Sequence, residues 1–245
     1  MFHFKKYNTN NMKIVKWILI PVFLLAAWSL TAQTADEIIA KNIEAMGGRE
    51  KLSSLNSVKM TGNLNVQGAD VAVTLTKLNH VGIKVDIEVM GTYNYQMANA
   101  KEGWIYMPIQ GMEQPRKMDE GEYENSFRQA DLQGALFDYA AKGSTVKLED
   151  KENVNRKPAY VLTVTEKTGQ QMKYYIDENT NRVVKITSIL KINGAETPIE
   201  SGFDNYKQNK DGYWFAYTHI TSQGNIEYDN VETNIPVDES LFTNK

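Results

Sequence analysis

The 245-residue chain contains no cysteine. This absence excludes disulfide bonds, thiolate metal sites and a cysteine nucleophile. It also excludes the acyl anchor of a bacterial lipoprotein, which is attached to a cysteine directly after the leader. Stability must therefore come from an ordinary hydrophobic core. Hydrophobic residues make up 42% and aromatic residues 10% of the chain, which is enough to form one.

The chain also lacks an excess of basic residues, with 27 lysines and arginines against 30 aspartates and glutamates. The first 32 residues hold four of the lysines and no acidic residue. Residues 33–245 therefore carry 23 basic and 30 acidic residues, a net charge of −7. Binding to a phosphate backbone requires clustered lysine and arginine. We predict no nucleic-acid partner.

The apolar stretch near the N-terminus is too short for a typical transmembrane helix. Residues 17–30 are uncharged and follow Lys13 and Lys16, whereas a spanning helix needs about 20 apolar residues. A basic start, a short apolar core and small residues after it are typical of a secretory signal peptide. We predict a cleaved signal peptide at residues 1–32 and a single domain at 33–245. An uncleaved N-terminal anchor is the alternative.

Common catalytic motifs are missing as well. The sequence has no G-x-S-x-G, no H-E-x-x-H and no G-x-x-x-x-G-K, and after the leader its only histidines are His80 and His219. The acidic clusters at 119–122 and 149–152 could supply paired carboxylates for glycosidic hydrolysis, but their polar, turn-like surroundings favour solvated charge. We predict no enzyme, no metal site and no cofactor, with an undetected hydrolase as an alternative.

The spacing of the residues that are present predicts a mainly β chain with few helices. Thr34 and Glu37 form a capping box that starts an N-terminal helix, and Gly47-Gly48 ends it. Residues 81–89 alternate between apolar and polar side chains, as an antiparallel strand with one wet face does. Residues 120–141 have helical spacing, which we expect Gly134 to divide into two short helices.

About eleven strands are expected in all, separated by turns rich in glycine, asparagine and aspartate. Open twisted sheets rarely exceed about ten strands without curling or closing. We therefore predict an α+β fold: one large curved antiparallel sheet with helices against its concave side. The pattern alone leaves open whether that concavity is filled or hollow.

Methionines and aromatic residues are concentrated between positions 90 and 118. Methionine suits surfaces that must fit variable apolar partners, because its side chain is flexible and polarizable. The stripe predicts either part of the core, which composition favours, or the wall of an apolar cavity. Its members are Met90, Tyr93, Tyr95, Met97, Trp104, Tyr106, Met107, Met112 and Met118.

Several short segments, taken in order, resemble LolA-like envelope proteins, often called outer membrane lipoprotein-sorting proteins. Each segment is weakly specific, but together they cover nearly all of residues 33–245. They are AMGGREKL (45–52), VKMTG (58–62), GWIYMP (103–108), LFDYAAKG (136–143), VKL (146–148), KPAYVL (157–162), YYID (174–177), FDNYK (203–207) and IPVDESLF (235–242).

The resemblance implies an unclosed half-barrel in which a helical lid covers a hydrophobic cavity. It implies a monomeric periplasmic carrier of lipid or lipoprotein acyl chains, working with donor and acceptor proteins of the envelope. The alternative is a non-transporting module that senses lipid or protein. The cavity residues would be Met60, Leu64, Leu75, Ile87, Met90, Tyr93, Tyr95, Trp104 and Tyr106, and the lid residues Phe127, Leu132, Leu136 and Phe137.

Two positions depart from the pattern of the lipoprotein carrier. That protein usually has an arginine and a proline in the strand after its second hairpin, and the arginine ties the lid shut. The matching stretch here, residues 78–86, lacks proline and has Lys84 as its nearest basic residue. Lysine lacks the planar fork of arginine. Tyr217 likewise stands where the family often has a proline.

Overall fold

The computed structural model describes residues 1, 3, 33–66, 69–192 and 194–244. The chain divides into two compact units, Met1–Ala32 and Gln33–Lys245. The expected signal peptide lies in the first unit, almost wholly outside the described residues. The longest described helix has 11 residues, and none of the described helices has the length and apolar character needed to cross a bilayer. The following description concerns the second unit.

The second unit is built on one antiparallel sheet, in which fourteen described strands are joined in the order β6-β5-β4-β3-β2-β1-β14-β13-β12-β11-β10-β9-β7, with β8 also paired to β9. The end strands β6 and β7 do not pair with each other, so the predicted unclosed sheet is confirmed. The strands are β1 (Ser57–Val66), β2 (Ala69–Leu78), β3 (Gly82–Val89), β4 (Thr92–Asn99), β5 (Gly103–Tyr106), β6 (Arg116–Lys117), β7 (Thr145–Leu148), β8 (Glu152–Val154), β9 (Lys157–Thr165), β10 (Gln171–Asp177), β11 (Val183–Ile192), β12 (Ala195–Gln208), β13 (Trp214–Thr221) and β14 (Gly224–Thr233).

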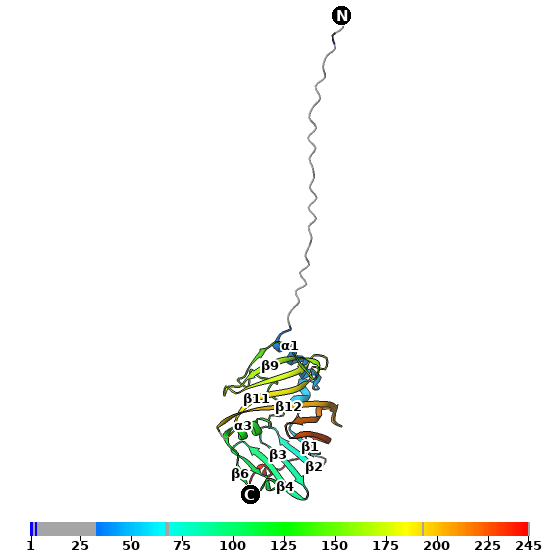
Figure 1. Ribbon diagram of the computed structural model, residues 1–245. Helices are drawn as coiled ribbons and strands as arrows, with labels where there is room; N and C mark the ends of the chain where they lie inside the picture. Colours follow the sequence, from blue (N-terminus) through cyan, green and yellow to red (C-terminus); the bar gives the residue numbers. More distant parts are fainter. Residues whose placement is uncertain (2, 4–32, 67–68, 193, 245) are drawn as a thin grey trace. The chain divides into compact units, whose positions relative to one another are not determined.

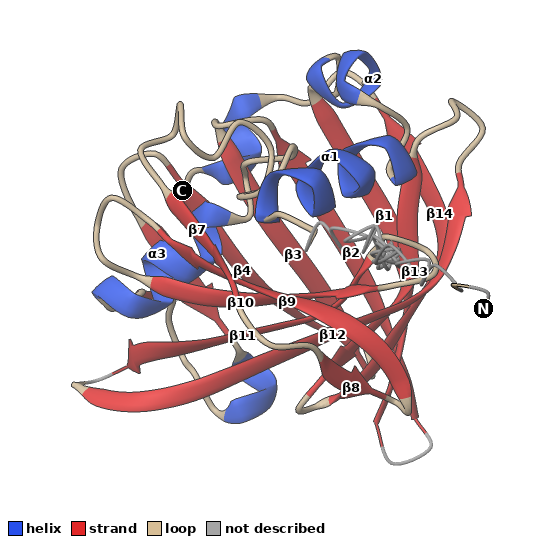
Figure 2. Ribbon diagram, turned by 90° about the horizontal axis from the view of Figure 1, so that it is seen from above, coloured by secondary structure: helices blue, strands red, loops and turns tan. Residues whose placement is uncertain are grey.

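The sheet consists of two meanders. Strands β1–β6 and strands β9–β14 each pair in chain order, and the first strand of one meander pairs with the last strand of the other, β1 with β14. The sheet curls so that β3 and β4 lie across from β9–β11 (Figure 2). The count exceeds the expected eleven in part because it includes β6 and β8, which are only two and three residues long.

The two faces of the sheet follow from the pairing register. Leu75 lies opposite Met60 on one side and Val85 on the other, so these three side chains share one face. They belong to, or pack against, a buried cluster that also holds Val231 and Tyr228. This is the concave face, because helices and loops pack against it.

Helix α1 (Ala35–Ala45) covers one part of the concave face (Figures 1 and 2). Its capping box is as predicted: the Thr34 amide donates to Glu37 Oε2 at 3.1 Å, and the Glu37 amide donates to Thr34 Oγ1 at 3.2 Å. Ile38, Ile39 and Ile43 pack on side chains of β9 and β10 in a second buried cluster. The short helix α2 (Arg49–Ser53) follows.

The central helical segment is shorter than expected. Helix α3 spans Glu120–Arg128, and residues 129–143 form turns instead of a second helix. Gly134 and Asp138 adopt φ values of 77° and 50° there. A right-handed helix cannot continue through such residues. Two 3₁₀ turns complete the described elements, Pro108–Gln110 and Glu239–Phe242.

Candidate ligand cavity

A cavity of about 630 Å³ lies on the concave face. Ligand sites in proteins are typically of about 300–1,000 Å³. Its wall comes from strands of both meanders, from α3 and from the turns that follow α3. The apolar members are Met46, Met60, Leu75, Phe127, Met172, Ile186, Ile199, Phe203, Phe215 and Tyr228, and the charged or imidazole members are Lys77, His80, Arg128, Asp131, Lys142, Glu166, Lys167 and His219.

The wall of β10, β11 and β12 is set by strand alternation. Tyr174, Ile186 and Ser201 are direct cross-strand neighbours, and all three line the cavity. Glu200, next to Ser201 in sequence, points to the other face and is mostly exposed. The alternation therefore separates residues that can touch a ligand from neighbours that cannot.

Helix α3 lies across the concavity. It contacts β3, β4 and β5 on one side and β11 on the other. The approach to β11 is so close that a Cβ atom on Gly121 would meet the Lys191 carbonyl oxygen at 1.9 Å, so only glycine fits there. On the other side, the Tyr123 hydroxyl donates to the Asn99 carbonyl oxygen at 3.1 Å. The helix thus bridges the two meanders above the cavity.

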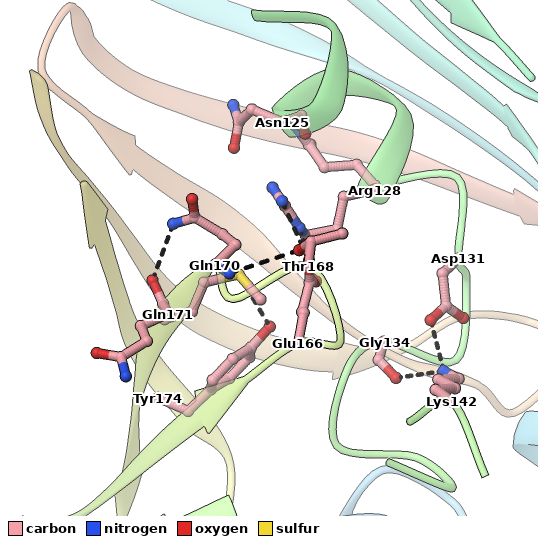
Figure 3. Close-up of polar contacts among 12 residues, drawn as sticks. Asn125, Arg128, Asp131, Gly134, Lys142, Glu166, Thr168, Gln170, Gln171 and Tyr174 are labelled. Carbon is pink, nitrogen blue, oxygen red and sulfur yellow. Dashed lines mark hydrogen bonds and ion pairs between the residues drawn. The ribbon is translucent and has the colours of Figure 1, made fainter. Parts of the chain in front are cut away.

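Two ion pairs lie in the cavity lining (Figure 3): one connects α3 to the β9–β10 turn, and the other joins two residues of the turns that follow α3. Arg128 Nε donates to Glu166 Oε1 at 2.8 Å and Nη2 donates to Oε2 at 3.3 Å, with side-chain exposures of 18% and 21%. Lys142 pairs with Asp131 and also donates to the Gly134 carbonyl oxygen at 2.8 Å. These contacts neutralise four of the charged groups in the lining.

Lys77 lies on the concave face of β2, opposite Val58 and Ile83. Burial away from water lowers the pKa of its amine from 10.5 to about 8, and the nearby Asp131 carboxylate only partly offsets this. Among the described residues no carboxylate lies within ion-pair distance of the amine, and Asp131 forms its ion pair with Lys142. Lys77 is thus an unpaired cation inside a mostly apolar cavity.

His219, on β13, faces the same cavity. Its ring stacks on Phe203 with centroids 5.1 Å apart. Burial, and secondly the charge of Lys77, lower the pKa of the imidazole from 6.5 to about 4, so the ring is neutral at pH 7. Its Nε2 atom is buried without a hydrogen-bond partner. His80 also lines the cavity, from the turn between β2 and β3.

The described residues contain no group of three or more His, Cys, Asp or Glu side chains that could hold a metal ion. In the part of the chain that the structure describes, the cavity combines an apolar wall, two internal ion pairs and, away from its exposed rim, the unpaired lysine Lys77. This combination suits binding of a ligand that has both an apolar part and a polar end.

Three of the thirteen residues expected at the site line the cavity: Met60, Leu75 and Phe127. Leu132 packs against the cluster beneath α3. Leu64 and Ile87 lie in or against a separate cluster with Val71 and Val73. Leu136 and Phe137, expected in the lid, are 5% and 7% exposed in the core formed with α1.

The aromatic residues of the methionine-rich stripe lie elsewhere. Tyr93, Tyr95, Trp104 and Tyr106 are paired in register with Glu88, Asp86, Met97 and Tyr95, which places them on the face opposite Leu75 and Val85. Tyr95 contributes to a groove beside the C-terminal residues, where its hydroxyl donates to Asn244 Oδ1 at 2.9 Å. Met90, at the β3–β4 turn, is 90% exposed.

Lys84 is on this outer face too. Its amine pairs with Asp86 at 3.0 Å and lies 5.6 Å and 5.5 Å from the ring centroids of Tyr93 and Tyr95. It therefore has no contact with α3, and it does not act in place of the family's lid arginine. Arg128, which sequence reasoning did not select, ties α3 to the β9–β10 turn instead.

Lys77 was not among the residues expected at the site, although the pattern of its strand distinguishes it. It continues the apolar alternation Val71, Val73 and Leu75, so it occupies a position where an inward-facing apolar residue is expected. A charged residue in such a register is a candidate functional position, because burying a charge is costly. No local pattern in the sequence marks Met172, Phe203 and His219 as cavity residues.

Comparison with solved structures shows the class of fold. The unclosed antiparallel sheet of this chain also occurs in proteins of known structure. A DUF1329 family protein from Desulfovibrio piger aligns over 86% of this chain and 98% of its own, with a TM-score of 0.54 and 12% identity.

The particular fold is LolA-like. The LolA superfamily protein NE2245 from Nitrosomonas europaea aligns over 87% of this chain and 99% of its own, with a TM-score of 0.52 and 14% identity. No protein-family model matches the sequence, and a search of curated proteins found no match. The resemblance noted from the sequence is thus confirmed at the level of fold.

Proposed function

We propose that the protein is a monomeric periplasmic carrier that holds acyl chains of lipids or lipoproteins in the concave cavity and delivers them to an acceptor. The observation that carries the proposal is the cavity itself: about 630 Å³, walled by apolar side chains of both meanders and bridged by α3. The similarity to a LolA superfamily structure supports it. The proposed activity is binding and delivery rather than catalysis.

Burial of apolar surface supplies the binding energy, at about 0.8 kcal/mol for each CH₂ group removed from water. Entry and release require α3 and the turns after it to move away from the wall, since the helix bridges both sides of the concavity. The Arg128–Glu166 pair is the polar contact that must open on the β10 side. Donor and acceptor proteins of the envelope would act on this segment.

The test combines a binding measurement with a matched pair of variants. Protein purified gently from the cell envelope is analysed by native mass spectrometry, then stripped of lipid and titrated with a 16-carbon acyl ligand. Ser201→Trp places an indole in the cavity, whereas Glu200→Trp places the same group on the opposite face of β12. We expect about one lipid per chain in the wild type and in Glu200→Trp, and none in Ser201→Trp.

Circular dichroism spectra and melting temperatures show whether both variants are folded. A folded wild-type chain that carries no lipid and takes up none would refute the proposal. Uptake by Ser201→Trp equal to that of Glu200→Trp would show that the ligand binds outside this cavity.

A further inference from the structure

We propose that Lys77 binds the carboxylate of a single-chain fatty acid, so that the cavity selects acyl ligands with a free anionic end over neutral ones. The inference rests on the proposed function and names its ligand class. It follows from the position of Lys77, from the other polar groups of the cavity and from the cavity's size.

No ion pair among the described residues stabilises Lys77, and the attraction of Asp131 offsets its burial only in part. Its neighbours across the strands, Val58 and Ile83, are 2% and 3% exposed, so the amine stands at the edge of an apolar cluster. An unpaired buried cation destabilises a fold, and an apolar side chain of similar size would avoid that cost. A bound anion would supply the missing partner.

The other cationic side chains of the lining are less suited to bind a carboxylate than Lys77. Arg128 and Lys142 are already paired with Glu166 and Asp131. Lys167 is exposed on the β9–β10 turn, where water solvates it. Among the described residues of the lining, Lys77 is thus the half-buried cation without an ion pair, and a charge-assisted hydrogen bond is stronger at such a site than in water.

His219 supplies a second polar contact. Its ring is neutral at pH 7 and its Nε2 is buried without a partner. An N–H at this position can donate to a carboxylate oxygen, while the ammonium of Lys77 donates to the same group. Asp131 Oδ1 is also unpartnered, but its repulsion of an anion is reduced by the Lys142 ammonium bound to Oδ2.

The size of the cavity limits the ligand to a small one. A volume of about 630 Å³ is that of a pocket for one drug-sized molecule. One acyl chain matches this better than the several chains of a diacyl lipid or a lipoprotein anchor. The apolar wall would hold the chain, and the carboxylate would be directed to Lys77.

The experiment compares palmitate with its methyl ester, which has the same chain but no charge. Dissociation constants are measured by calorimetry or by displacement of a fluorescent probe, for the delipidated wild type, Lys77→Met and the control Lys173→Met. Lys173 is exposed on β10, on the face opposite to its cavity-lining neighbours Met172 and Tyr174. We expect the wild type and Lys173→Met to prefer palmitate by roughly 10- to 100-fold, the value of one charge-assisted contact. We expect Lys77→Met to lose this preference and still bind the ester.

Each other outcome has a definite meaning. Equal binding of both ligands by the wild type, or a preference that survives in Lys77→Met, overturns the inference and leaves the carrier function standing. Failure of the wild type to bind either ligand overturns the carrier function as well.

A second measurement needs no variant. The ¹³C resonance of carboxyl-labelled palmitate is followed during acidification of its complex with the unaltered protein. A carboxylate held by Lys77 keeps its charge to lower pH than a carboxylate in water, because the adjacent cation stabilises the ionised form. A bound carboxyl group that titrates as the free fatty acid does, or is protonated at higher pH, overturns the inference even if Lys77→Met does not fold.

Discussion

Replacing Lys77 by methionine should stabilise the protein in a pH-dependent way. Burial lowers the pKa of the Lys77 amine from 10.5 to about 8, and each pKa unit corresponds to 1.36 kcal/mol. The difference amounts to about 3 kcal/mol, which we reduce to about 2–3 kcal/mol because the side chain retains some contact with water. Methionine has a similar length and carries no charge, so the variant escapes this cost.

The direction in which the free energy of unfolding changes with pH follows from the protons bound by the folded and unfolded states. Below pH 8 the amine is charged in both the folded and the unfolded chain, and the full cost of burying the charge is present. Between pH 8 and 10.5 the folded protein releases the proton while the unfolded chain keeps it, so the free energy of unfolding rises with pH. Above pH 10.5 both states are neutral and the cost is gone.

The assay is urea unfolding of the lipid-free protein, followed by circular dichroism at pH 7, 9 and 10.5. Other groups titrate over this range in both proteins, so the quantity of interest is the difference in unfolding free energy between Lys77→Met and the wild type. We expect this difference to shrink by about 2–3 kcal/mol from pH 7 to pH 10.5. Lys167→Met, at an exposed lysine of the same cavity, should follow the wild type. A difference for Lys77→Met that is constant with pH would show that Lys77 is well solvated, and would refute the reasoning.

Three further predictions concern other parts of the fold. His219→Phe should remove a pH-dependent loss of stability of about 2–3 kcal/mol. The wild type suffers this loss between pH 6.5 and 4, because the unfolded chain binds a proton there that the buried imidazole does not bind. Urea unfolding at the two pH values measures the loss, and a loss of equal size in His219→Phe would contradict the prediction. Leu136→Ala should cost about 2–5 kcal/mol, since this side chain is in the core under α1, and a loss under 1 kcal/mol would place it in a mobile lid instead. Gly121→Ala should push α3 away from the Lys191 carbonyl and speed the exchange of bound lipid; unchanged exchange rates would mean that α3 does not control access.

Local patterns in the sequence were sufficient for several elements of the fold. The alternation in residues 81–89 placed β3. The capping box at Thr34 started α1 where predicted. These features depend on neighbours within a few residues, because side-chain period and capping are properties of the backbone over one or two turns.

The second half of the central segment shows where local reasoning failed. Residues 129–143 have helical spacing, yet Gly134 and Asp138 take positive φ and the chain forms turns. Contacts distant in sequence hold these turns: the Gln133 side chain donates to the Leu52 and Leu55 carbonyl oxygens, each at 3.0 Å. Tertiary contacts therefore outweighed helix propensity there.

By itself the sequence determined that this is a cysteine-free, mainly β chain with one large antiparallel sheet, and that β3–β5 carry side chains on alternate faces. It did not determine which face becomes concave. Only the pairing of β1 with β14, strands at opposite ends of the domain, joins the two meanders and brings Lys77 of β2 into the same cavity as His219 of β13. The stripe of Tyr93, Tyr95 and Trp104 consequently lies on the outer face. Alternation is a local property of a strand, whereas curvature and long-range pairing depend on contacts that the whole domain makes together.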